Sequence, residues 1–481
     1  MLARQTAIYF ASNIFSAIFG FLNVVVFTRM FAMDAYGHYV LGFAFAVLFA
    51  TLLSTALKLS ILRHQARGDE DVRALILAGA MLGLVLAPVG FVAALGAGLS
   101  AAVAGAAVVL AYVIALFDTS LEMLRAQQKA LHFMRGTVYR ALFVSVFGIG
   151  VAFLGSSGLL LLGSTALAVL AAVLMVWRMA WGGAKPQFDR AKLKELFVSG
   201  LPVTLSMSLL ALSSVLDRFV LVHFAGAAAG GQFGASLDLV RQGLIIPAIS
   251  VASAFVPAAV QALARGGEAE ARAHLNKYLE ILLATALPAC VGLALVSPLV
   301  ADFVLGPDFR AVAHQAMPIL SIAVIFQILT QQYLHTSFLL SNRNLFYFAN
   351  TGSIIVFNLL AAIFLMPLLG IMGAVWGRLA TEIFGFLNAL VLSRYAFALP
   401  VFNGAVMRIA GAAALMALVV FALLSPLKAM GPLALLIIIP AGMAVYAAAV
   451  WLLDIGEARK YVNWSRIFPK RGVSAGEGHG L

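Results

Sequence analysis

The chain has 481 residues, of which 63% are hydrophobic and only 10% are charged. A soluble domain carries about 25% charged residues, so this composition excludes a soluble globule and predicts that lipid surrounds most of the chain. The single cysteine, Cys290, excludes an intrachain disulfide. The net charge of +12 would suit nucleic acid, but the basic residues stand between apolar stretches, so we expect no nucleic-acid partner.

Fourteen apolar segments are candidates for crossing a bilayer, for which a helix needs about 20 residues. The first six lie at 7–27, 37–57, 74–95, 101–117, 138–154 and 159–176. A polar stretch follows at 178–195. The other eight lie at 200–222, 231–255, 279–301, 312–334, 346–365, 373–392, 404–424 and 432–453. These segments predict an all-α polytopic membrane protein with about 14 transmembrane helices.

The lysine and arginine residues predict the orientation of these spans, because they concentrate on the cytoplasmic side. With the N-terminus inside, 25 of the 31 basic residues fall in cytoplasmic segments. The six exceptions are Arg29, Arg218, Arg241, Arg310, Arg378 and Lys428. We therefore predict a multi-pass inner-membrane protein with both termini in the cytoplasm.

Two loops that lie six spans apart resemble each other. Residues 66–74 read ARGDEDVRA and residues 264–273 read ARGGEAEARA, and each loop is followed by a proline inside the next span, Pro88 or Pro288. A repeat with an even number of spans gives two parallel halves related by an axis along the membrane normal. Such paired halves are typical of transporters, which hold a central site between them.

The repeat predicts how the chain is divided. We expect an N-terminal lobe at 1–177, a cytoplasmic linker at 178–199 and a C-terminal lobe at 200–393. Two extra spans at 394–455 and a cytoplasmic tail at 456–481 complete the chain. The two six-helix lobes are expected to be related by a pseudo-two-fold axis along the membrane normal.

Charged residues inside the spans are the candidates for a functional site, because a charge at mid-bilayer costs about 2.5–3.5 kcal/mol and usually faces water or a partner. Arg378 and Glu382 are four residues apart, so they share one helical face, and Asp238 and Arg241 share a face in the same way. Either these groups only neutralise one another and join helices, or they line a cavity.

A cavity lined by arginine suits a diphosphate group, because a guanidinium stays protonated and binds phosphate through two parallel hydrogen bonds. The acidic residues could instead take up cations or protons that drive transport. The candidate substrate-binding residues are Arg29, Arg218, Arg241 and Arg378. The candidate ion-coupling or ion-pair residues are Asp217, Asp238 and Glu382.

Short motifs along most of the chain point to a family. They are Arg29 followed by YGHY at 36–39, LRA at 124–126, LKELFVSGLP at 193–202, and Asp217-Arg218. With its pattern of fourteen spans, the chain resembles the oligosaccharide-flippase branch of the multidrug/oligosaccharidyl-lipid/polysaccharide exporter superfamily. The resemblance implies a V-shaped cavity between two lobes and movement of undecaprenyl-diphosphate-linked sugars to the outer leaflet of a bacterial inner membrane. It also implies that Arg29 and Arg218 meet the diphosphate or acidic sugars.

Other functions stay open. A cation-coupled multidrug exporter of the same superfamily would usually have fewer spans and more acidic residues in its N-terminal lobe. A membrane glycosyltransferase or polymerase could use Asp34 as a base, but the longest outer loop, near 302–311, is short for holding sugars. A non-transporting scaffold or scramblase-like protein would leave the arginines inside the spans unexplained.

The sequence contains no H-E-x-x-H, Walker or G-x-S-x-G motif, so we expect no enzyme of those classes and no cofactor or metal. The expected partners are a lipid-linked oligosaccharide, the lipid bilayer, and a polysaccharide polymerase or other assembly proteins. We expect the protein to be a monomer.

Overall fold

The computed structural model describes residues 2–65, 72–155, 157–341, 343–401, 403–457 and 459. The regular elements in these ranges are all helices, as a chain in lipid requires, because a helix satisfies its own backbone hydrogen bonds. Residues 66–71, which form most of the first repeat loop, lie outside the described residues, as does the predicted tail beyond 459.

The helices follow the predicted spans closely, with ends that extend a few residues further. The N-terminal helices are α1 (Leu2–Met30), α2 (Met33–Gln65), α3 (Val72–Gly83), η1 (Leu84–Leu86), α4 (Ala87–Gly96), α5 (Ala101–Ala126), α6 (Ala130–Leu154) and α7 (Gly158–Trp181). The remaining ones are α8 (Arg190–Val304), α9 (Pro307–Ile328), η2 (Leu329–Leu334), α10 (His335–Leu340), α11 (Asn344–Leu369), α12 (Ile371–Tyr395), α13 (Gly404–Leu424), η3 (Lys428–Ala434), α14 (Leu435–Leu452) and η4 (Ile455–Glu457).

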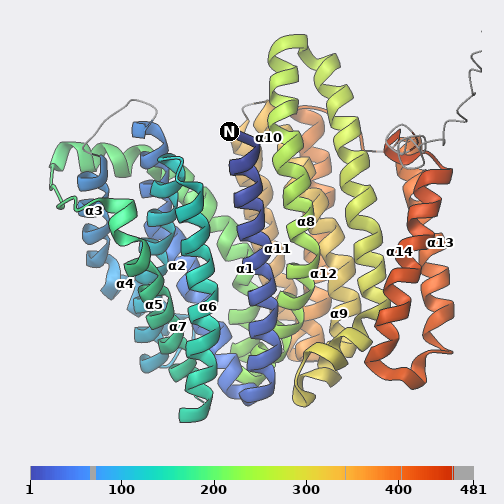
Figure 1. Cartoon of the computed structure of the whole chain (residues 1–481), viewed down its shortest axis with the longest axis horizontal. Helices are drawn as coiled ribbons and strands as arrows, with labels where there is room; N and C mark the ends of the chain where they lie inside the picture. Colours follow the sequence, from blue (N-terminus) through green and yellow to red (C-terminus); the bar gives the residue numbers. More distant parts are fainter. Residues whose placement is uncertain are drawn as a thin grey trace, which may run out of the picture. The chain divides into compact units, whose positions relative to one another are not determined.

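Helix α8 is 115 residues long and contains three of the predicted spans. Gly226 and Gly267 interrupt it with φ values of +82° and +72°, in the left-handed region where a helix turns away and where glycine is favoured. In the described residues, eleven helices including α8 are apolar and long enough to cross a membrane, and Ile14–Met30 is a shorter apolar helix. Counting α8 as three passes gives thirteen, and the shorter helix Ile14–Met30 brings the number to fourteen. The structure therefore confirms the predicted multi-pass membrane protein, whose helices are shown in Figure 1.

The chain divides into two compact units. The first comprises Met1–Ile249 and Leu293–Leu399, and the second comprises Ser250–Gly292 and Pro400–Leu481. This division follows contact density and cuts through the predicted C-terminal lobe. The predicted lobe boundaries therefore stay a prediction.

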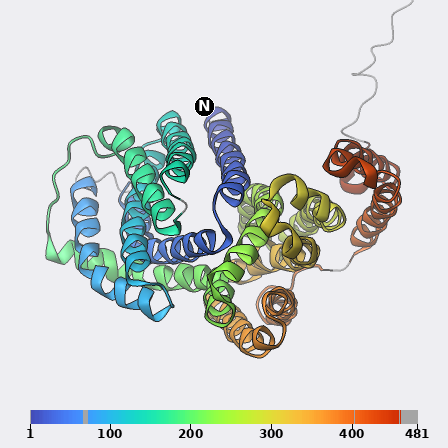
Figure 2. The ribbon, with the colours of Figure 1, turned by 90° about the horizontal axis from the view of Figure 1, so that it is seen from below.

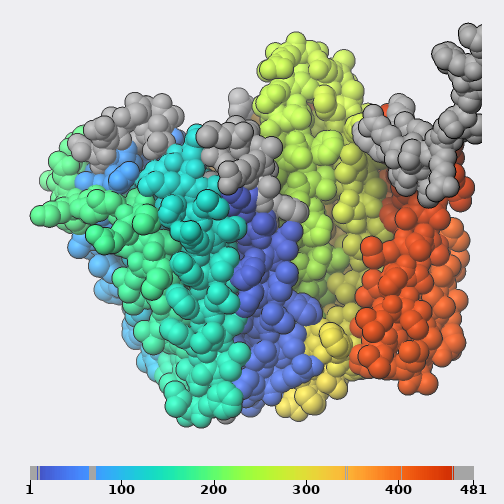
Figure 3. Space-filling model, viewed as in Figure 1, coloured from blue at the N-terminus to red at the C-terminus, as the bar shows by residue number. Residues whose placement is uncertain are grey.

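In the first unit, the N-terminal helices form a bundle around α5 and α7. Helix α2 packs against α5 and α7, and α6 packs against α7 and α1. Figure 3 shows α1 in blue and α6 in teal side by side on one face of this unit. The buried core of the bundle includes Phe45, Leu110 and Phe117. Helices α9, α11 and α12 pack together in the same unit.

The second unit contains α13 and α14, which pack against each other. The hydroxyl of Tyr446 in α14 donates a 2.8 Å hydrogen bond to the carbonyl of Ala284. The carboxylate of Glu280 accepts from the backbone N–H of Gly456 at 2.7 Å. These bonds tie α14 and η4 to the last part of α8 inside this unit.

Candidate functional site

Three of the predicted residues form one buried cluster. The Arg378 guanidinium lies 3.2 Å from Asp217 Oδ2 and 2.7 Å from Glu382 Oε1. It also donates to the Ser213 carbonyl at 3.2 Å. All three charged side chains are at most 6% exposed. One guanidinium on α12 thus joins α12 to α8 and neutralises two carboxylates, in the hydrogen-bonded arrangement that a buried charge needs.

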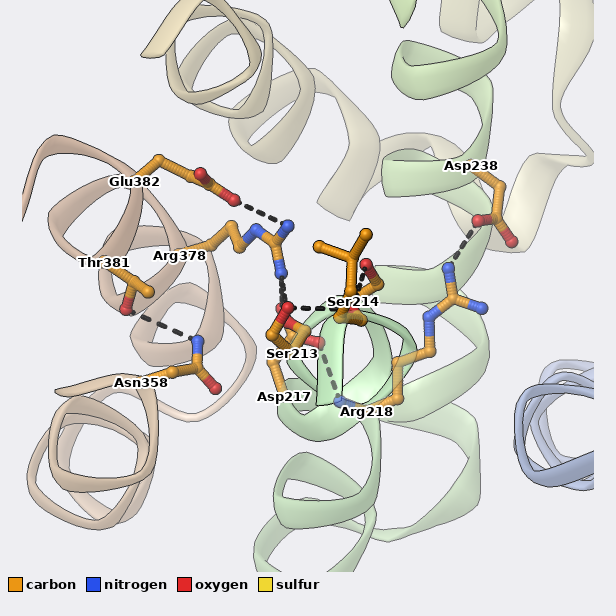
Figure 4. Close-up of polar contacts among 10 residues, drawn as sticks. Ser213, Ser214, Asp217, Arg218, Asp238, Asn358, Arg378, Thr381 and Glu382 are labelled. Atoms are coloured by element: carbon orange, nitrogen blue, oxygen red, sulfur yellow. Dashed lines mark hydrogen bonds and ion pairs between the residues drawn. The ribbon is translucent and has the colours of Figure 1, made fainter. Parts of the chain in front are cut away.

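Arg218 follows Asp217 in α8 but has a different partner. Adjacent residues of a helix point about 100° apart, and Figure 4 shows Asp217 directed toward Arg378 while Arg218 extends toward Asp238. The Arg218 Nη2 donates to Asp238 Oδ1. The Asp217 carboxylate accepts from the Arg218 backbone N–H at 3.1 Å. The expected pairing of Asp238 with Arg241 is therefore replaced by a contact between two passes of α8.

A cavity of about 360 Å³ adjoins the Arg218–Asp238 pair. Its walls come from α1, α2, α6 and α7 and from the α8 segment that carries Arg218, Asp238 and Gln242. It therefore lies between N-terminal helices and part of the predicted C-terminal lobe. Arg218 is 5% exposed, and its Nε is buried without a hydrogen-bond partner.

Arg140 is the cavity residue that the sequence analysis missed. Its position near the predicted start of a span led us to count it with the cytoplasmic loops, but the structure places it inside α6 on the cavity wall. Its Nη1 lies 4.0 Å from Asp118 Oδ1, and its guanidinium lies 5.3 Å from the centre of the Phe117 ring. Because α6 begins at Ala130, eight residues before the predicted span, Arg140 lies nearly three turns inside the helix. A predicted span with this earlier start would have identified Arg140 as a charged residue inside the membrane.

Arg241 is half-buried near both clusters. Among the described side chains, it has no ion pair within 4.0 Å and no hydrogen bond. Asp238 and Glu382 attract it, and Arg218 and Arg378 repel it. The three arginines and three acids within reach of one another carry no net charge when all are ionised.

Arg29 lies apart from this cluster. It is exposed at the end of α1 and donates a hydrogen bond to the Phe303 carbonyl near the end of α8. It does not line the cavity. Its predicted contact with substrate stays a prediction.

Neutral polar groups also line the cavity. The Ser145 hydroxyl donates to Asn23 Oδ1 at 2.6 Å, and Gln242 Oε1 is buried without a partner. Asn23, Gln242, Tyr36 and Tyr39 all contribute to the wall. The cavity therefore combines guanidinium groups with amide and aromatic side chains, a set that can bind a phosphate and sugar hydroxyls.

Close contacts beside the cavity join the end of α1 and the start of α2 to α8 and to the start of α9. Gly37 of α2 approaches the Ala227 carbonyl so closely that a Cβ at Gly37 would overlap it. The Gly306 N–H donates to Thr28 Oγ1 at 3.2 Å. The Tyr36 ring, which lines the cavity, meets the Phe309 ring edge-on with centroids 5.4 Å apart. We call these contacts between 28–37 and the segments 227–232 and 303–309 the latch.

Gly37→Ala tests the latch. Its Cβ has no room against a backbone carbonyl, so we expect a destabilisation of about 1–3 kcal/mol, typical of overpacking. Gly96→Ala is the matched control, because a Cβ at Gly96 meets nothing within 4 Å. The melting temperatures of the detergent-solubilised proteins provide the measurement. Equal melting temperatures would show that the latch tolerates a side chain.

The glycosyltransferase or polymerase alternative depends on Asp34. Asp34 is exposed at the start of α2, 3.4 Å from His38 Nε2, and does not line the cavity. Within the described residues, no three His, Cys, Asp or Glu side chains are grouped to hold a metal ion.

A multi-pass helical membrane protein with a charged cavity between its helices has an architecture typical of transporters. The sequence profile described as polysaccharide biosynthesis protein matches residues 2–263. This chain belongs to that family. No curated protein sequence matches the chain.

Solved structures show the same fold. The lipid II flippase MurJ in an inward closed conformation matches with a TM-score of 0.75 and 15% identity, over 95% of this chain and 100% of that one. An inward-facing multidrug resistance MATE family transporter of the MOP superfamily matches with a TM-score of 0.62 and 16% identity, over 85% and 95%. An outward-facing multidrug resistance MATE family transporter of the MOP superfamily matches with a TM-score of 0.56 and 17% identity, over 85% of this chain and 96% of that one. The chain thus has the MOP-superfamily fold that the resemblance implies.

Proposed function

We propose that this protein flips lipid-linked oligosaccharides, in which a diphosphate joins the sugar to an undecaprenyl chain, across the membrane for surface polysaccharide assembly. The observation that carries the proposal is the Arg218 guanidinium, buried in a cavity wall with an unpartnered Nε. Inside a low-dielectric cavity such a group attracts an anion more strongly than it does in water. The polysaccharide biosynthesis family supports the same substrate class.

In this proposal Arg218 and Arg140 bind the diphosphate from two walls of the cavity. Arg218 comes from α8 and Arg140 from α6, so one anion bridges the two lobes. Asp238, whose side chain is 32% exposed, is the counter-ion that the diphosphate displaces from Arg218. Arg241 adds a further positive charge near the same anion. Arg378 does not contact the substrate but positions Asp217, the residue next to Arg218.

Cation-coupled export of small molecules is the second candidate function. It needs a carboxylate that can bind a cation, but Asp217 and Glu382 share Arg378, and Asp238 pairs with Arg218. A guanidinium already pairs with each of these carboxylates, which counts against a cation as the substrate. Coupling of flipping to a proton or sodium gradient is compatible with either function.

Alternating access would expose the cavity to each side in turn. The Tyr36 side chain lines the cavity and also belongs to the latch through its contact with Phe309. A bound substrate that contacts Tyr36 can therefore strengthen or weaken the latch. We propose that the predicted lobes at 1–177 and 200–393 move about this contact, while the linker at 178–199 connects them.

The cellular setting is proposed from the charge distribution. The excess of lysine and arginine on one side favours a bacterial inner membrane protein with cytoplasmic termini. We propose a monomeric transporter without enzymatic activity that hands its substrate to a polysaccharide polymerase or other assembly proteins.

Deletion of the gene tests the function in the host. We expect surface polysaccharide to disappear and lipid-linked oligosaccharide to accumulate in the inner membrane, because synthesis continues without export. Expression of the intact chain should restore both, measured by polysaccharide staining and by extraction of lipid-linked sugars. Normal export in the deletion strain would disprove the proposal.

A further inference from the structure

A second cavity of about 610 Å³ lies in the first unit and shares no lining residue with the charged one. It lies among α2, α3, η1, α5, the end of α7 and the first turns of α8. Nearly all of its lining is aliphatic or aromatic, including Leu53, Leu77, Leu116, Trp177 and Phe197. We call it the apolar groove.

Two polar side chains of the apolar groove make hydrogen bonds within the protein. The Thr204 hydroxyl donates to the Gly200 carbonyl at 2.9 Å, and the Tyr112 hydroxyl donates to the Gly83 carbonyl. The lining therefore offers a ligand little hydrogen bonding. A hydrocarbon chain is the ligand that such a surface accepts without leaving a polar group unpaired.

A break in the third span contributes to the apolar groove. Pro88 follows the 3₁₀ turn of η1 (Leu84–Leu86), and proline cannot continue the α-helical hydrogen bonds behind it. The Ala87 N–H bonds to the Leu84 carbonyl in place of the Gly83 carbonyl, which leaves Gly83 to accept from Tyr112. The outward faces of Leu84 and Val85 are 54% and 73% exposed, so this edge borders the lipid.

Two basic residues lie near the linker segment that contributes to the apolar groove. Lys185 is exposed between two lining residues, Ala184 and Pro186. Arg73 reaches the linker, where its Nη1 would lie 2.7 Å from a Cβ at Gly182. The neighbouring acid, Asp189, uses its carboxylate to accept from the first backbone N–H groups of α8 at 2.9 and 3.1 Å.

We propose that the apolar groove binds one anionic glycerophospholipid of the surrounding bilayer. An acyl chain lies along the groove, and the phosphate contacts Lys185 and Arg73 at the end that the charge distribution assigns to the cytoplasm. The positive charge of these two residues favours an anionic headgroup, and the apolar lining of the groove accommodates an acyl chain. This inference does not rest on the proposed flippase function.

Selectivity must come from the headgroup in this arrangement. An acyl chain that leaves the bilayer for an apolar groove gains little, because lipid is as apolar as leucine. Two basic residues near a membrane surface give a preference of roughly tenfold or more for an anionic lipid over a zwitterionic one. We therefore expect the groove to prefer anionic over zwitterionic lipids that carry the same acyl chains.

Quenching of Trp177 tests the proposal, because this residue lines the apolar groove. The purified full chain is placed in nanodiscs of zwitterionic lipid that contain a small fraction of lipid with brominated acyl chains, either anionic or zwitterionic. Subtracting the signal of Trp177→Phe isolates the quenching of Trp177. We expect the anionic brominated lipid to reach half-maximal quenching at roughly a tenth of the fraction that the zwitterionic one requires.

Two sets of variants separate the groove from ordinary lipid contact. Lys185→Gln with Arg73→Gln should bring the two quenching curves together. Ala80→Phe, which fills the apolar groove, should remove the preferential quenching, whereas Ala93→Phe should keep it, because Ala93 is exposed on α4 outside the lining. Equal quenching by both brominated lipids in the unmodified protein would overturn the proposal, as would an undiminished preference in Ala80→Phe.

Discussion

Replacing Arg378 by alanine is expected to remove most of the folded protein. Asp217 and Glu382 are 2% and 6% exposed in their side chains, so without the guanidinium two buried carboxylates lose the cation that they share. Breaking a buried ion pair by removing one partner costs about 3–5 kcal/mol, which is a large part of the stability of a typical protein. The yield of monodisperse protein after detergent extraction and its melting temperature measure the loss.

Two controls identify the cause of that loss. Arg394→Ala removes an exposed arginine from the last turn of the same helix, and we expect it to leave the yield unchanged. Neutralising the whole group, with Arg378→Met, Asp217→Asn and Glu382→Gln together, should recover much of the yield, because no buried charge is then left unpaired. A normal yield of the single Arg378→Ala variant would mean that water reaches the carboxylates.

Replacing Arg218 by alanine is expected to slow transport at least tenfold while leaving the protein folded. Its partner Asp238 is 32% exposed beside the cavity, so that carboxylate can be hydrated when the guanidinium is gone. The loss of a charged hydrogen bond to the substrate is worth about 1.5–3 kcal/mol, which corresponds to a decrease of roughly tenfold to more than a hundredfold in transport. Export of lipid-linked sugar, normalised to folded protein, measures the effect.

Arg218→Lys and Asp238→Asn refine this test. Lysine keeps the charge but lacks the planar fork of arginine, so its transport rate should fall between those of the wild type and Arg218→Ala. Asp238→Asn removes the anion that competes with the diphosphate, so substrate binding should tighten. If transport by Arg218→Ala fell only in proportion to the amount of folded protein, Arg218 would have a structural role alone.

The sequence predicted the helices well because lipid imposes a simple rule. Each span must be a long apolar helix, and the predicted span at 404–424 coincides with α13. The merging of three spans into α8 was not predictable from hydropathy, because its turns at Gly226 and Gly267 depend on single backbone conformations. The division into two compact units could not be predicted from the sequence either, because each unit combines segments that are distant in the chain.

The sequence singled out the charged residues of the two clusters around Arg378 and Arg218, but not most of their partners. Spacing along one helix gave the Arg378–Glu382 pair correctly. It also suggested Asp238 with Arg241, whereas Asp238 contacts Arg218, twenty residues away in α8. Partners on other passes or helices depend on how the helices pack, which periodicity does not encode. Arg140 was overlooked for the related reason that its span begins earlier than hydropathy indicates.

Flipping in a purified system tests the central claim most directly. The protein is reconstituted into liposomes that contain a lipid-linked oligosaccharide, and the fraction of its sugar that becomes accessible to an impermeant glycosidase is followed with time. We expect the wild-type chain to raise the rate well above that of protein-free liposomes, and Arg218→Ala to return it close to that background. Identical rates with and without the wild-type protein would contradict the account, as would flipping by Arg218→Ala at the wild-type rate.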